Sequence, residues 1–84
     1  MPKSLQDFLG YSIYFWSNEH LPVHVHVSKG NPQEDATKIE VTAEKVVLIH
    51  NKSQIPSEDL KKIIRYVEQN RAKVISKWYQ HFGL

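Results

Sequence analysis

The chain has no cysteine among its 84 residues, so neither disulfide bonds nor thiolate metal sites can form. Its three glycines do not build the glycine-rich loop that cradles phosphate groups. The net charge of +2 is too small to indicate nucleic-acid binding by itself. No long apolar run is present, which argues against both a signal peptide and a membrane span. These absences predict a cytoplasmic protein that does not enter a membrane.

The length is sufficient for one domain, spanning residues 1–84. Hydrophobic residues make up 40% of the chain and charged residues 24%, as in ordinary globular proteins. A domain of this size has one core that must serve every element.

Four runs have the composition and alternation of β-strands, at residues 11–16, 23–28, 37–42 and 45–49. The last run is apolar throughout, which predicts a strand buried on both faces or nearly so. Residues 1–10 show no clear pattern, and we expect them to form a short turn or to pack loosely over the sheet.

From Ser57 onward, apolar residues recur at the spacing of one helical face, and Gly83 ends the pattern. The stripe is interrupted at Asn70 and Arg71, so a kink near Asn70 or two abutting helices are alternatives to one continuous helix. The predicted fold is α+β: a small antiparallel β-meander of three to four strands, with a long C-terminal helix packed on one face.

Three of the five histidines lie within seven residues, at His20, His24 and His26. His24 and His26 alternate with the valines of residues 23–27. Because successive side chains of a strand point to opposite faces, the valines should face the core and the two imidazoles should face away from it.

The predicted strand 11–16 can pair as a hairpin with the segment 18–27, which we call the histidine ribbon. If the turn centres near His20, Tyr14 lies opposite His26 and Trp16 lies opposite His24. The register is an inference, because a bulge in the connection would move every side chain to the other face.

The ribbon carries a motif of Asn, Glu, His, Pro and His-x-His-Val, here Asn18, Glu19, His20, Pro22, His24, His26 and Val27. In this motif the chain resembles a bacterial family known as domain of unknown function 4160. That family ends in a helix containing a tryptophan, and Trp78 stands in the matching place. The chain departs from the family pattern in having Val23 in place of a second proline and Val25 in place of an aromatic residue. The resemblance implies a small partner protein encoded by a neighbouring gene, in a toxin–antitoxin-like pair.

The histidines have a structural and a metal-binding interpretation. In the first, His20 and one other histidine hydrogen-bond the backbone around the Pro22 connection. In the second, His24 and His26 bind one divalent transition metal such as zinc, with His20 or Glu19 as a third ligand.

A catalytic interpretation makes His24 and His26, with His20 as a further candidate, general acids or bases that cleave RNA. Neighbouring aromatic and basic side chains would stack on the bases and steer the strand, namely Tyr14, Trp16 and Lys29.

The remaining interpretation is a surface that recognises a partner protein, formed by Tyr14, Trp16, Glu19 and Lys29. We expect this interaction role first and a histidine-dependent hydrolase or nuclease second. The sequence alone leaves open whether the protein is an enzyme.

Overall fold

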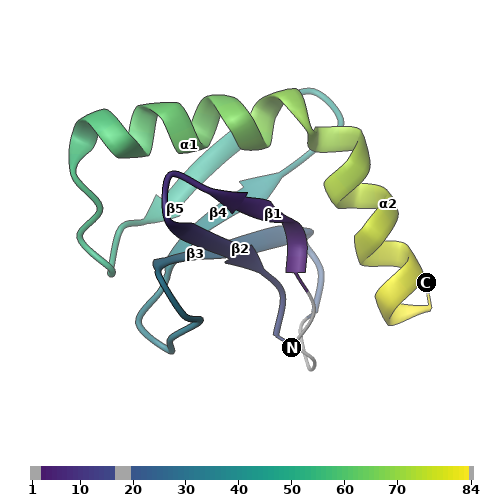
Figure 1. Ribbon diagram of the computed structural model, residues 1–84. Helices are drawn as coiled ribbons and strands as arrows, with labels where there is room; N and C mark the ends of the chain where they lie inside the picture. The colour runs from purple at the N-terminus through teal and green to yellow at the C-terminus, as the bar shows by residue number, and fades with distance from the viewer. Residues whose placement is uncertain (1–2, 17–19, 84) are drawn as a thin grey trace.

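The computed structural model describes residues 3–16 and 20–83. Within them, one antiparallel sheet has the strand order β1-β2-β3-β4-β5, and two helices follow it in the chain (Figure 1). The elements are β1 (Lys3–Phe8), β2 (Tyr11–Tyr14), β3 (His24–Lys29), β4 (Thr37–Val41), β5 (Val46–His50), α1 (Ser57–Gln69) and α2 (Arg71–Phe82). Each strand pairs with the next one in the chain, so the α+β meander with a C-terminal helical region is confirmed.

The sheet has one strand more than predicted, because residues 3–8 form β1. A two-residue turn joins β1 to β2, and both of its residues, Leu9 at φ 53° and Gly10 at φ 80°, have positive φ, as type I′ hairpins require. Leu5 pairs with Ile13 and is 2% exposed. The register shifts on both sides of the Leu5 pair, and this irregularity accounts for the absence of a clear alternation in the sequence.

The prediction that the apolar run 45–49 is buried on both faces is wrong. β5 is the last strand of the sheet, and its three central residues are 38%, 38% and 46% exposed, at Val47, Leu48 and Ile49. The register also shifts between the pairs of Lys38 and Ile39 with β5. The apolar run therefore predicts that residues 45–49 form a strand, but it does not predict that this strand lies at the edge of the sheet.

The predicted helical region consists of two helices that meet at Asn70. Asn70 ends α1 by two kinds of hydrogen bond: its backbone N–H donates to Val67, and its side-chain amide donates to the carbonyl of Tyr66 at 2.8 Å. Figure 1 shows the chain changing direction here, with α1 crossing over the sheet and α2 turning down beside one end of it.

The core lies between the helices and one face of the sheet. Ile63 and Val67 of α1 and Val74 and Trp78 of α2 are all 0% exposed. They join a cluster with the inward-facing residues of the strands, including Ile13, Val25, Val27 and Ile39. Tyr11 ties β2 to α1, because its hydroxyl donates to the Asp59 carboxylate at 2.9 Å. Burial and this bond with Asp59 raise the pKa of Tyr11.

Candidate functional site

The part of the histidine ribbon from His24 onward belongs to β3, which pairs with β2 in the predicted register. Tyr14 lies opposite His26, and Ile13 lies opposite Val27. Val25 and Val27 are 0% exposed, whereas His26 is only partly buried. The inward phase of the valines is therefore confirmed. The ladder ends at Tyr14, so Trp16 is not paired with His24 in it.

His24 differs from His26, because it is only 3% exposed. Its ring lies 5.1 Å from the ring of Trp78 and 5.0 Å from that of His26, measured between centroids. The carbonyl of Pro22 can only accept, so Nδ1 of His24 carries a proton and donates it at 2.8 Å. His24 is on the predicted face of β3, opposite Glu40, but the expectation that it is accessible is not met, because the ring of Trp78 from α2 lies against it.

The candidate metal ligands do not converge in the described part of the chain. His20 is exposed and lies outside the strands, whereas His24 is buried. Glu19 falls outside the described residues. Among residues 3–16 and 20–83, no group of three histidine or acidic side chains is arranged to hold a metal ion.

The candidate binding-surface residues lie in three different surroundings. Tyr14 is 0% exposed, and its hydroxyl donates to the carbonyl of Gln33 at 2.9 Å while accepting from the N–H of the same residue at 3.0 Å. Trp16 is partly buried, and its ring lies 6.2 Å from that of His26. Lys29 is exposed at the far end of β3, with Nζ 5.9 Å from the ring centre of Tyr11. Of the three described candidates, only Trp16 therefore lies beside the histidines with part of its surface accessible.

The structure adds two residues to the histidine site, Lys38 and His50. His26 lies directly opposite Lys38 of β4, and Lys38 lies directly opposite His50 of β5. Directly opposed side chains of antiparallel strands lie on the same face. His26, Lys38 and His50 thus form a cross-strand row on the face opposite α1, which we call the outer face. The hairpin pattern of residues 37–49 contained a signal for this row, because pairing its two strands brings Lys38 near the end of the apolar run.

His50 has an unusual electrostatic environment for a surface histidine. Its pKa is lowered by burial first, and then by the positive charges of Lys52 and Lys38. Its Nδ1 atom is buried and has no hydrogen-bond partner among the described residues. Two cations and an unsatisfied ring nitrogen therefore meet at the end of β5.

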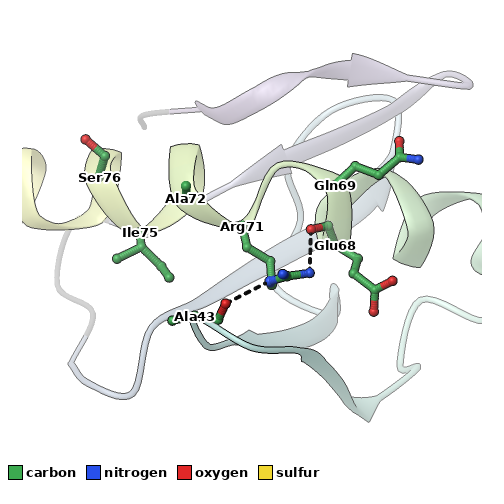
Figure 2. A pocket seen from close by; sticks show the side chains of 7 residues that line it. All are labelled: Ala43, Glu68, Gln69, Arg71, Ala72, Ile75 and Ser76. Carbon is green, nitrogen blue, oxygen red and sulfur yellow. Dashed lines mark hydrogen bonds between the residues drawn. The ribbon is translucent and has the colours of Figure 1, made fainter.

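A pocket of about 470 Å³ lies elsewhere, at the junction of the two helices (Figure 2). Arg71 crosses it and donates from Nε to the carbonyl of Ala43 at 3.2 Å and from Nη1 to the carbonyl of Glu68 at 2.9 Å. Apart from Arg71 and Glu68, its lining is small, apolar or neutral, at Ala43, Gln69, Ala72, Ile75 and Ser76. Arg71 joins the β4–β5 turn to the helix junction, and none of the histidines lines this pocket.

The fold and the site define a small α+β domain with a histidine-bearing central strand. Residues 10–79 match the family described as a domain of unknown function (DUF4160), and the chain belongs to that family. The match includes the whole histidine ribbon. Comparison with curated proteins and with solved structures gives no match. No helix in the described residues is long and apolar enough to cross a membrane.

Proposed function

We propose that this protein is a cytoplasmic protein-interaction module that binds the small protein encoded by a neighbouring gene, in a toxin–antitoxin-like pair. The partner adds a β-strand to β5. The observation that carries the proposal is the exposure of three consecutive apolar residues, Val47, Leu48 and Ile49, on a strand at the edge of the sheet.

The exposure belongs to the edge rather than to one face of β5. Val47 lies opposite Glu40 and Leu48 lies opposite Ile39, so the two point to opposite faces of the sheet. Both are nevertheless 38% exposed. Exposure on both faces is expected for a strand at the edge of the sheet. A strand added beside β5 would cover the side chains that point to either face.

The backbone of β5 also favours strand addition. An edge strand presents a row of N–H and C=O groups with no strand to pair with, and proteins usually protect such edges with charge, proline or a covering element. The central residues of β5 are Val47, Leu48 and Ile49, with neither charge nor proline among them. Main-chain pairing would supply affinity, and the alternating apolar side chains would supply specificity.

Hydrolysis of RNA by His24 and His26 is our second candidate. A general acid or base must come within hydrogen-bond reach of the proton that it transfers. His26 is partly accessible, but His24 is 3% exposed and donates from Nδ1 to Pro22. We therefore place the interaction role first.

The test is co-expression of the protein with its neighbouring gene product, followed by affinity capture. We expect Ile49→Lys to abolish capture, because the charge would be buried under the added strand. Tyr79→Lys is the matched control, since Tyr79 is a large exposed side chain, 41% accessible, on α2. Far-ultraviolet circular dichroism should show that both variants remain folded.

Capture of the partner by Ile49→Lys at the wild-type level would contradict the proposal. So would a wild-type protein that is dimeric alone, becomes monomeric in Ile49→Lys, and captures its partner in both forms. In that case β5 would pair with a second copy of the chain instead.

A further inference from the structure

We infer that the outer face of the sheet binds single-stranded nucleic acid, with its phosphates at Lys38, His50 and Lys52 and a base against Trp16 and His26. This inference is independent of the partner strand proposed for β5. It depends on side chains of the outer face and not on the backbone of the edge.

The first argument is the convergence of cationic and imidazole groups. Neighbouring strands lie about 4.8 Å apart, so the row from His26 on β3 to His50 on β5 spans roughly 10 Å. Lys38 stands between the two imidazoles. Lys52, two residues beyond His50, is close enough for its charge to act on that ring. Lysine ammonium groups and the N–H group of a neutral imidazole donate hydrogen bonds to phosphate oxygens.

The second argument is an aromatic surface next to the cations. The ring of His26 stacks on Tyr14, with centroids 5.8 Å apart and an angle of 27° between the planes. Trp16 lies against both rings, at 5.4 Å from Tyr14 and 6.2 Å from His26, and is partly exposed. Proteins bind single strands by placing a positively charged track beside aromatic rings on which bases stack.

Among the described residues, the carboxylate that β4 places on this face lies outside the row. Glu40 occupies the next row along the strands, opposite His24 on one side and Val47 on the other. The small net charge of the whole chain is therefore compatible with a locally positive site, because Glu40 does not interrupt the line from His26 to His50. A row of side chains across three strands also suits a single strand better than a duplex groove, which proteins commonly read with an inserted helix or ribbon.

The test is fluorescence anisotropy with a labelled oligoribonucleotide of about ten nucleotides and a deoxyribonucleotide of the same sequence. We expect saturable binding, and the tighter of the two probes identifies the natural class of strand. The double variant Lys38→Gln, Lys52→Gln should bind about tenfold more weakly or worse. Its plot of log affinity against log salt should be shallower by about 1.4, at about 0.7 per lost phosphate contact.

The matched control is Lys61→Gln, Lys62→Gln, which removes the same charge from the exposed side of α1. It should change affinity by less than about threefold, as expected for charges outside the contact. Trp16→Ala should weaken binding by about tenfold through loss of base stacking. If Lys38→Gln impairs folding, Lys52→Gln alone carries the test, because Lys52 is exposed in a turn.

The inference would be overturned if neither the oligoribonucleotide nor the deoxyribonucleotide showed saturable binding. Equal losses in the outer-face and α1 variants would also overturn it, since binding would then reflect overall charge. An unchanged affinity in Trp16→Ala would remove the base-stacking part of the site and with it the assignment to nucleic acid.

Discussion

Val25 and His26 are chain neighbours in β3 with opposite environments. Val25 is 0% exposed beneath the helices, and His26 is on the outer face. We expect Val25→Asp to unfold the domain, because an unpaired buried carboxylate costs several kcal/mol. His26→Asp should remain folded, since its side chain reaches water. Equal loss of far-ultraviolet circular dichroism in the two variants would contradict the assigned strand phase.

His50 should make the stability of the domain depend on pH. Its pKa in the folded protein lies below the ordinary value of 6.5. Above that value the imidazole is neutral in both states, and its contribution to stability is complete. As the pH falls below 6.5, the unfolded chain takes up the proton before the folded protein does, so the free energy of unfolding decreases. The decrease ends once the pH is below the pKa of His50 in the folded protein.

Urea unfolding between about pH 7 and about pH 5 measures this contribution. The fall in unfolding free energy should be smaller in His50→Gln than in the wild type. It should be reduced partly in Lys52→Gln, because Lys52 is one of the two charges that lower the His50 pKa. An unchanged pH dependence in both variants would mean that His50 titrates alike in the folded and unfolded states.

Alternation along a strand settled the face of these residues but not their depth. The phase of Val25 and His26 could be predicted, because side chains alternate strictly. The burial of His24 depends on Trp78, more than fifty positions away in the chain, and that of Tyr14 depends on the loop that contains Gln33. Lys38 and His50 join the site through the pairing of separate strands, which a local motif does not contain.

At the scale of the elements, α2 supplies a large part of the core. Val74 and Trp78 are 0% exposed, and Trp78 packs against Phe15 and Phe82 at centroid distances of 5.1 and 4.5 Å. Truncation after Asn70 removes two fully buried side chains worth about 1.5–3 kcal/mol each, besides smaller contributions. That loss is comparable with the stability of a small domain.

We therefore expect the 1–70 fragment to lack a cooperative thermal transition in circular dichroism. The double variant Tyr79→Ala, Gln80→Ala, on the exposed side of α2, should melt close to the wild type. A fragment that unfolds cooperatively near the wild-type midpoint would show that α1 and the sheet suffice for the core.

The helices and strands could be predicted where the hydrophobic periodicity is regular. The prediction failed where the periodicity is irregular. The strands that begin near Tyr11, His24 and Thr37 follow a simple alternation or composition, and the helical stripe is equally clear. β1 was missed because its register shifts twice within six residues. The position of β5 at the edge is a property of the assembled sheet, which a run of apolar residues does not encode.

At the scale of the whole molecule, both helices follow the sheet in the chain and pack with one of its faces in a two-layer domain. This arrangement leaves the β5 edge and the partly exposed row of His26, Lys38 and His50 on the outer face for other contacts. β2, β3 and β4 each have a strand on both sides, whereas β1 and β5 have one. Amide hydrogen exchange should accordingly be slowest in the three central strands and faster in β1 and β5.

The same measurement separates the two surfaces that we propose. A partner strand would engage the outward backbone groups of β5, so its addition should slow exchange at the β5 amides. A single-stranded oligonucleotide would contact side chains such as Lys38 and Trp16. It should leave exchange at Val47, Leu48 and Ile49 nearly unchanged while shifting the side-chain resonances of the outer face. Slower amide exchange at Val47, Leu48 and Ile49 on addition of the oligonucleotide would contradict these assignments. So would unchanged exchange at these amides on addition of the partner, because the partner is assigned to the β5 edge and the nucleic acid to the outer face. The two ligands use different groups of one small sheet, the backbone of β5 and the side chains of the outer face, so the edge variant and the outer-face variants can each be tested against both ligands.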